Sequence, residues 1–239
     1  MSAVSCLVCA APAVTALLAV HLLKRTIDRG KRIDLGLRLD RGALAWMAAM
    51  VAVAVVILCL TAGVLALMGA RAPVADPLSS LPVEARNWAR LPAAISMGFL
   101  FAAIPEETIW RGWFYSSAGS THLAAVVSVL TFTVMHLASN GGQHGLGQRF
   151  IYLVGTIGFA TAAMAVRSVT GSVWPAIGVH GGMLMAEDLL AYHLGVPKQP
   201  WTWITVGVLW AAVGVALLLW GRSHRHSHRP NGPRAVEPA

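Results

Sequence analysis

Long apolar runs separated by short polar stretches dominate this chain. Three runs are clear, at residues 4–23, 43–69 and 201–220, and the last has a tryptophan at each end. About 20 apolar residues are needed to cross the hydrocarbon core of a bilayer, and tryptophan is enriched at its interfaces. Four less uniform apolar segments lie between these runs, at residues 93–115, 123–139, 150–166 and 173–192. The pattern predicts an all-α fold, a polytopic transmembrane helical bundle of about seven spans.

The polar positions predict how the rest of the chain is organised. Residues 71–91 form the one long polar connection between spans, and their prolines favour an irregular segment or a short surface helix over 82–90. We expect residues 1–221 to form a single integral-membrane domain, with its catalytic motifs within 93–192. Residues 222–239 are rich in His, Arg, Ser and Pro, a composition that predicts a disordered basic tail.

Composition supports a membrane protein and narrows its partners. Hydrophobic residues make up 56% of the 239 positions and charged residues only 12%, roughly half the charged share of a soluble domain. The net charge is +8, but the basic residues flank spans and form no aromatic-interleaved domain, so nucleic acid is not an expected partner. Cys6, Cys9 and Cys59 lie in or beside apolar segments, where they act as small hydrophobes, and no disulfide framework is predicted.

The positive charges are unevenly distributed between the two sides of the predicted bundle. Seven lie between the first two spans and four follow the last: Lys24, Arg25, Arg29, Lys31, Arg32, Arg38, Arg41, Arg222, Arg225, Arg229 and Arg234. The positive-inside rule places both regions in the cytoplasm, and therefore the N-terminus outside. With seven spans, 13 Lys and Arg residues are inside and five outside. The first segment has no basic residues before it, so we expect a span and not a cleaved signal peptide.

Two adjacent acids and an arginine lie within the third predicted span. An ionised group at membrane depth costs at least roughly 2.5–3.5 kcal/mol, so Glu106 and Glu107 require pairing, hydration or a function. Glu107 and Arg111 are four residues apart, the spacing at which side chains share a helix face. Glu106 projects about 100° away and is free to face another group. Alone, these residues would also fit a span boundary with Arg111 reaching lipid headgroups.

Two histidines in later spans favour a catalytic site instead. His136 ends the sequence Phe132-Thr133-Val134-Met135-His136, and His180 lies in the sixth segment; neither has a carboxylate beside it in sequence. A carboxylate and an imidazole in a partly dry cavity suit general-base activation of water, and a second imidazole suits donation to a developing oxyanion. Hydrolysis is the reaction class that this set of residues predicts.

The order of these motifs resembles the CPBP family of intramembrane glutamic endopeptidases, which includes CAAX prenyl proteases and bacterial Abi or bacteriocin-processing proteins. The resemblance rests on Glu106-Glu107-x-x-x-Arg111, Phe132-x-x-x-His136 and the motif that begins at His180, and it covers about residues 97–190. One position departs from the family pattern: Leu184 stands where the third motif usually has Asn or Asp. Asn140, Glu187 and Asp188 are candidate substitutes for the missing polar side chain.

The resemblance implies an intramembrane endopeptidase that hydrolyses peptide bonds in a membrane-associated protein or peptide. Glu106 and His136 would activate water, His180 would stabilise the oxyanion, and Glu107 with Arg111 would support the site. We also expect a multi-pass protein of a bacterial plasma membrane, and the positive-inside rule places its C-terminal tail in the cytoplasm. We expect no cofactor; in a metalloenzyme, Glu106, His136 and His180 would bind Zn²⁺, although their spacing is not specific for zinc.

Two other functions stay open. Because of Leu184, the chain fits a non-catalytic family member that acts as a bacteriocin-immunity or membrane scaffold protein. A small transporter with Glu106 and His136 as a proton relay is the third interpretation.

Overall fold

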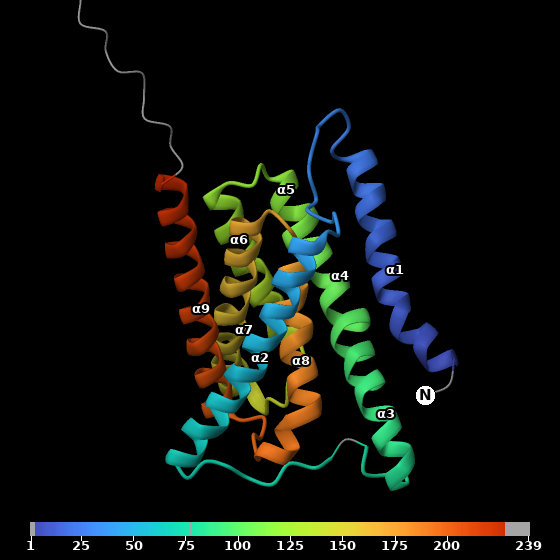
Figure 1. Ribbon diagram of the computed structural model, residues 1–239, viewed down its shortest axis with the longest axis vertical. Coiled ribbons are helices and arrows are strands. Elements are labelled where there is room, and N and C mark those ends of the chain that lie inside the picture. Colours follow the sequence, from blue (N-terminus) through green and yellow to red (C-terminus); the bar gives the residue numbers. More distant parts are fainter. Residues whose placement is uncertain (1–2, 77, 228–239) are drawn as a thin grey trace, which may run out of the picture.

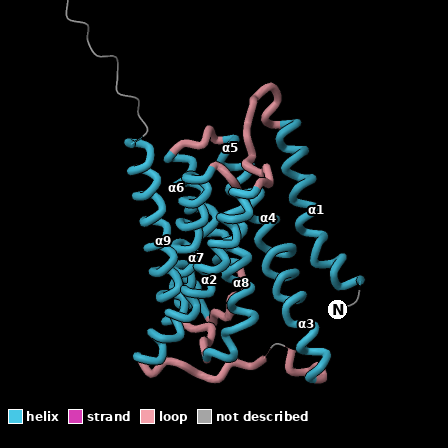
Figure 2. Tube along the Cα trace, in the orientation of Figure 1, coloured by secondary structure: helices cyan, strands magenta, loops and turns pink. Residues whose placement is uncertain are grey.

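Helices form the whole of the regular structure in the computed structural model, which describes residues 3–76 and 78–227. No strand occurs in that part of the chain, so the predicted all-α fold class is confirmed. The long helices run roughly along one direction (Figures 1 and 2). In chain order the described α-helices, long and short, are α1 (Ala3–Thr26), α2 (Arg41–Leu67), α3 (Val83–Ile95), α4 (Ile104–Glu107), α5 (Tyr115–Ser117), α6 (His122–Met135), α7 (Gly145–Thr170), α8 (Trp174–Leu194) and α9 (Pro200–Ser227).

Each of the seven predicted spans coincides with a helix, but not all seven helices have the length and composition of a span. Five described helices are long and apolar enough to cross a membrane: Val8–Thr26, Arg41–Leu67, Val83–Ser117, Gly145–Thr170 and Pro200–His224. The helix at His122–Ala138 is shorter, and α8 is not among the five. The first half of α8 is almost wholly buried, from Pro175 to Gly182. It is therefore surrounded by protein, which explains why its sequence is less uniformly apolar than that of a lipid-facing span.

The third span differs from its predicted bounds. Helix α3 begins at Val83 and continues as one helical segment through α4 and α5 to Ser117. The predicted separate surface helix is thus the first part of this long helix, which passes through Pro92. Two stretches within it, Ser96–Ala103 and Thr108–Phe114, are π-helical. Such wider turns are rare and often occur at functional sites, and here they flank the two glutamates.

The ends of the helices have local causes in the sequence. The Asp40 carboxylate accepts a hydrogen bond from the Ala43 backbone N–H at 2.9 Å and caps the start of α2. Gly171 and Gly195 follow α7 and α8 with positive φ angles of 72° and 63°, the left-handed conformation in which glycine ends helices. Helix α9 continues to Ser227 and so includes residues 222–227 of the segment predicted to be disordered; residues 228–239 lie outside the described residues.

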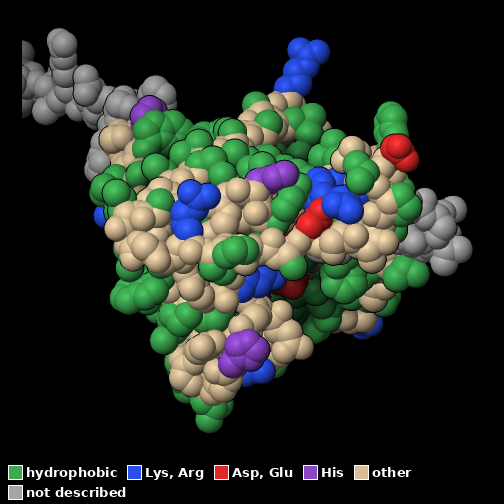
Figure 3. All heavy atoms as spheres, turned by 90° about the horizontal axis from the view of Figure 1, so that it is seen from below, with side chains coloured by type: hydrophobic (Ala, Val, Ile, Leu, Met, Phe, Trp, Pro, Cys, Tyr) green, Lys and Arg blue, Asp and Glu red, His purple; other side chains and the backbone are tan. Residues whose placement is uncertain are grey.

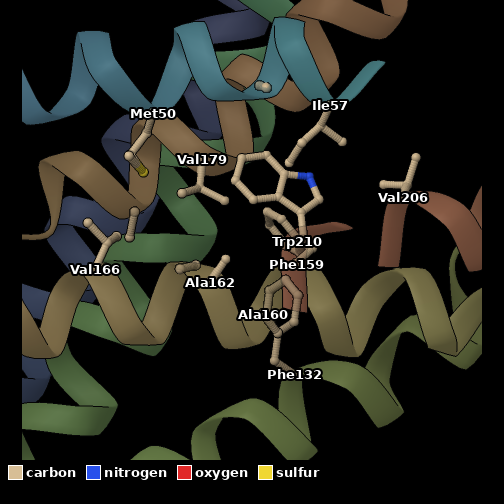
Figure 4. Packing of buried hydrophobic residues seen from close by; sticks show 13 residues of the cluster. Met50, Ile57, Phe132, Phe159, Ala160, Ala162, Val166, Val179, Val206 and Trp210 are labelled. Atoms are coloured by element: carbon tan, nitrogen blue, oxygen red, sulfur yellow. The ribbon is translucent and has the colours of Figure 1, made fainter. Parts of the chain in front are cut away.

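Close packing of small residues holds the bundle together. Gly158 of α7 and Gly207 of α9 meet so closely that a Cβ on either would overlap the other helix. On α8, a Cβ at Gly178 would lie 2.6 Å from the Met47 carbonyl oxygen of α2. Small residues are typical of such membrane helix contacts. The core beside them contains Trp210, fully buried among Ile57, Val179 and Phe159 (Figure 4).

The connection between α1 and α2 lies against one end of the bundle. Asp28, only 2% exposed, accepts hydrogen bonds from Trp113 Nε1 at 2.9 Å and Ser117 Oγ at 2.7 Å. The Gly36 carbonyl oxygen accepts from the Val173 backbone N–H at 2.9 Å. Gly36 has a φ of +68°, and a Cβ there would lie 2.6 Å from the Gly171 carbonyl oxygen. This connection therefore joins α1 to the ends of three other helical segments.

Candidate active site

The two adjacent glutamates lie in different environments. Glu107 is fully buried, whereas Glu106 is partly exposed and lines a cavity. Both belong to the four-residue helix α4 between the π-helical stretches. One Glu106 carboxylate oxygen, Oε2, is buried and has no hydrogen-bond partner among the described residues. A buried unsatisfied carboxylate oxygen is costly unless water or a ligand binds it.

Glu107 forms an ion pair with Arg111 in the interior of the bundle. Arg111 Nη1 donates to Glu107 Oε1 at 3.3 Å. Arg111 Nε lies 3.2 Å from Glu107 Oε2, but the two atoms are not aligned for a hydrogen bond, so their attraction is mainly Coulombic. Both side chains are fully inaccessible to solvent. The predicted pairing of these two residues is thus present, at a depth where each charge depends on the other.

Two neighbours complete the environment of the Arg111 guanidinium. Its Nη2 donates to the Ala160 backbone carbonyl at 3.2 Å, and its central carbon lies 4.3 Å from the centre of the Phe132 ring. A cation over an aromatic face is attracted by the ring quadrupole, and more strongly in a desolvated site. The ion pair is thereby fixed to both α6 and α7.

His180 of α8 binds the same glutamate. Its Nδ1 lies 3.0 Å from Glu107 Oε1, and the side chain is almost wholly buried. An ionised carboxylate only accepts hydrogen bonds, so Nδ1 donates and Nε2 is left for other contacts. The edges of the Phe159 and Phe132 rings hold the imidazole at centroid distances of 4.8 and 6.3 Å. Glu107 therefore orients His180 as well as Arg111.

His136 lies at the end of α6, where the helix tightens into a 3₁₀ turn over His136–Ala138. Its Nδ1 is 2.9 Å from the Phe132 carbonyl oxygen, and its ring packs on the Phe132 ring with centroids 4.4 Å apart. Because a carbonyl only accepts, Nδ1 carries the proton of the neutral ring and Nε2 keeps its lone pair. Phe132 thus contacts Arg111, His136 and His180.

A cavity of about 670 Å³ brings the predicted catalytic residues together. Glu106, His136 and His180 all line it, while Glu107 and Arg111 lie behind its wall. Its size is within the usual range of ligand sites. Leu184 also lines it, and so do Asn140, Glu187 and Asp188, the three polar residues considered as substitutes at that position.

Several contributing residues were missed by the sequence analysis. Tyr152 lines the cavity, but it is a single aromatic residue in an apolar segment and gives no signal there. The Ala160 carbonyl acts through the backbone and is likewise invisible in a sequence. Arg167, 6% exposed, gave no signal of a role in the site; it donates from Nε to the Arg111 carbonyl oxygen at 3.0 Å, which fixes the backbone of the site.

Zinc binding by Glu106, His136 and His180 was the alternative for these residues. Within the described part of the chain, no three His, Cys, Asp or Glu side chains are arranged to hold a metal ion. Both Nδ1 atoms are bound, one to Glu107 and one to the Phe132 carbonyl, which leaves Nε2 of each ring unengaged, as is common for histidines that ligate a metal. The three side chains are thus not drawn together as a metal site here, and the two Nε2 atoms with the Glu106 carboxylate are the groups that would bind Zn²⁺ in a metalloenzyme.

Fold and site together define a class: a helical protein with five described helices able to span a membrane and a buried Arg–Glu–His cluster beside a cavity. Residues 88–186 match the family model described as type II CAAX prenyl endopeptidase Rce1-like. The resemblance predicted from the three motifs is thus confirmed, since this segment contains all of them. No curated protein and no solved structure matches the chain.

Proposed function

We propose that this protein is an intramembrane endopeptidase that hydrolyses a peptide bond in a membrane-associated protein or peptide. The family match suggests a CAAX-protease type of peptidase. One observation carries the assignment of residues: Glu106, His136 and His180, from three separate helical segments, line the same cavity. The five apolar helices support a lipid bilayer as its environment.

In the proposed reaction, Glu106 and His136 activate a water molecule. The Glu106 carboxylate has a buried oxygen without a partner, and the neutral His136 ring keeps a free Nε2. The water oxygen attacks the peptide carbonyl carbon while its proton passes to this carboxylate–imidazole pair. The resulting C–O bond gives a tetrahedral oxyanion. When the C–N bond breaks, the departing amine takes that proton, so the pair returns to its starting state.

His180 is proposed to stabilise the oxyanion. Its Nδ1 is bound to Glu107, which leaves Nε2 as the donor when the ring is protonated. A fixed donor near developing charge in a dry site lowers the barrier because it needs no reorganisation. Glu107 and Arg111 are positioning residues in this scheme, because they hold His180 and the helix that carries Glu106.

The second candidate is a non-catalytic scaffold or immunity protein. The specific observation in its favour is that aliphatic Leu184 lines the cavity at the position where the related motif has Asn or Asp. A peptidase would then require another donor in the same cavity. Tyr152 and Asn140 both line it and carry suitable polar groups.

Cleavage of a quenched-fluorescent peptide library by the purified protein in detergent tests the proposal. Glu106→Gln and His136→Ala are each expected to reduce cleavage at least about 100-fold, the lower end for loss of a general base. Glu84→Gln is the matched control, because this exposed glutamate at the start of α3 is not among the residues that line the cavity. Wild-type rates are measured with and without a chelator.

The outcomes separate the mechanisms. Cleavage that survives the chelator but not Glu106→Gln supports the metal-independent reaction, and loss with the chelator shows metal dependence. Full cleavage by Glu106→Gln contradicts the proposed mechanism. If wild-type protein cleaves no library peptide but retains a membrane partner that also binds Glu106→Gln, the scaffold function is favoured.

A further inference from the structure

The connections between helices lie at two opposite ends of the bundle. At the first end are residues 27–40, 118–121 and 171–173, together with the C-terminal end of α9 (Figures 1 and 2). At the second end are residues 68–76 and 78–82 of one connection, and residues 139–144 and 195–199 of two others. Hydrogen bonds confirm the second group: the Ala72 backbone N–H donates to the Gly195 carbonyl at 3.3 Å, and Gln199 Nε2 donates to the Ala70 carbonyl at 2.7 Å.

The cavity containing the candidate active site reaches the second end. Its lining includes residues from all three connections there, for example Ala75, Asn140 and Lys198. None of its lining residues comes from the described connections at the first end. Figure 3 views the molecule from the second end, where the surface is hollowed near its centre and charged side chains surround the hollow.

The side of the cavity facing the first end is closed by packed polar groups. Glu107 and Arg111 are fully buried behind Glu106. Arg167 lies beyond them and donates from Nη2 to Ser116 Oγ at 3.3 Å and to the Asp34 carbonyl oxygen at 3.4 Å. The Asp34 carbonyl belongs to the connection between α1 and α2, which lies across the first end. A substrate therefore has no open route to the site from the first end.

The two ends differ in positive charge. Of the 16 Lys and Arg residues in the described part of the chain, Arg111 and Arg167 are buried inside the bundle, which leaves nine at the first end and five at the second. Two of those five, Arg86 and Arg90, are also paired with Asp76, at 3.3 and 2.8 Å. Short connections rich in Lys and Arg stay in the cytoplasm. The charge distribution therefore puts the first end inside.

We propose that the catalytic cavity opens on the non-cytoplasmic side of the membrane, so that its substrates are peptide segments presented on that side. The side of access rests on the cavity, the closed end and the charge distribution. The nature of the substrate rests on the proposed peptidase function. An exported peptide, or the outer segment of a membrane protein, is the class of substrate that reaches this opening.

A matched pair of cysteine variants tests the side of access without requiring activity. In a background with Cys6, Cys9 and Cys59 replaced by Ser, Ala75→Cys places a thiol at the cavity mouth and Ala118→Cys places one at the first end; both alanines are exposed. Sealed spheroplasts expressing either full-length variant are treated with a membrane-impermeant maleimide. We expect labelling of Ala75→Cys in intact spheroplasts and of Ala118→Cys only after permeabilisation. The reverse pattern, or equal labelling of both, overturns the proposal.

A second experiment tests delivery of substrate. A membrane-impermeant quenched peptide that is cleaved by the purified protein is added to spheroplasts and to sealed inside-out vesicles. Cleavage in spheroplasts but not in sealed vesicles is expected, and cleavage confined to the vesicles overturns the proposal. If the labelling pattern is as expected but no peptide is cleaved even in detergent, the peptidase function fails while the orientation of the cavity stands.

Discussion

At the scale of single residues, Glu107 is the centre of the site although it faces no cavity. It binds Arg111 of its own segment and His180 of α8, and so joins two elements that are far apart in sequence. Glu107 and Arg111 are inaccessible to water, and His180 is almost wholly buried. The Glu107 and Arg111 charges therefore depend on each other, and the cluster fixes His180 for its proposed role.

Removal of Glu107 is expected to destabilise the protein as well as inactivate it. In Glu107→Ala the Arg111 charge is left buried and unpaired, which costs roughly 3–5 kcal/mol. A large fall in the thermal unfolding temperature in detergent is the measurable result, and the exposed Glu84→Ala variant is the control. The double variant Glu107→Leu/Arg111→Met should recover part of this loss because it buries no charge. If the double variant is no more stable than the single one, the cost does not come from the unpaired charge.

Leu184 is the residue whose substitution is expected to increase activity. Its side chain lines the cavity without a polar group, and Leu184→Asn supplies an amide N–H at the position where the related motif has Asn or Asp. Loss of one oxyanion donor typically lowers kcat about 100- to 1,000-fold. The added amide donor of Leu184→Asn is therefore expected to raise kcat by on the order of tenfold or more. Peptide cleavage by Leu184→Asn is compared with that of Leu184→Ala, which also removes the leucine. Equal rates for both variants would show that no donor is missing there.

At the scale of elements, the close contact of α7 with α9 supports one wall of the cavity. Gly155 and Thr156 of α7 and Val206 of α9 line that wall. Gly207 is the next residue, and a Cβ on it would overlap the Val154 carbonyl. The position of the wall is therefore set by residues that have no side chain.

Gly207→Ala is expected to lower stability by about 1–3 kcal/mol, the usual cost of overpacking. Gly63→Ala is the matched control because it lies within the transmembrane helix α2, where a Cβ meets no atom within 4 Å. Thermal unfolding in detergent should show a lower midpoint for Gly207→Ala and an unchanged or slightly higher one for Gly63→Ala. Similar midpoints for the two variants would contradict the close contact.

The connection from α2 to α3 is expected to depend on pH. The hydrogen bond from Arg90 Nη2 to Asp76 Oδ2, 2.8 Å long, lowers the pKa of Asp76 below its usual value, and the Leu78 backbone N–H adds to this effect. A lowered pKa in the folded state means that the stabilisation is fully present above the unfolded carboxyl pKa of about 4. It is lost as the pH falls through the lower folded value.

Hydrogen exchange of residues 76–90 measures this dependence. Protection in wild type relative to Asp76→Asn should be greatest near neutral pH and should disappear at strongly acidic pH. The asparagine variant does not titrate, so its protection provides the reference at each pH. If the difference in protection between wild type and Asp76→Asn is the same at every pH, the Asp76 charge does not hold this connection.

At the scale of the whole molecule, the uneven charge distribution is expected to determine which side the cavity faces. Charge removal at the first end should therefore produce mixed orientations. In a variant with Lys24, Arg25, Arg29, Lys31 and Arg32 all replaced by Gln, part of the Ala118→Cys population should become labelled in intact spheroplasts. Arg71→Gln with Lys198→Gln, at the opposite end, is the control and should leave the labelling unchanged. Unchanged orientation after the five substitutions would mean that other features determine the topology.

The sequence by itself determined the features that depend on local spacing. Each predicted span is a helix because long apolar runs must satisfy their backbone hydrogen bonds internally in a bilayer. The pairing of Glu107 with Arg111 followed from the four-residue spacing that puts both on one helix face. The three motifs also carried the family resemblance, which the match over residues 88–186 confirms.

Only the tertiary structure decided which groups meet across the bundle. The contact between His180 and Glu107 joins residues 73 positions apart, and helical periodicity gives no information about such a pair. The same is true of Phe132, whose ring contacts Arg111, His136 and His180. The end at which the cavity opens depends on how connections distant in sequence come together. These features arise from packing between helices, since local spacing determines the face of a helix but not the neighbour that it meets.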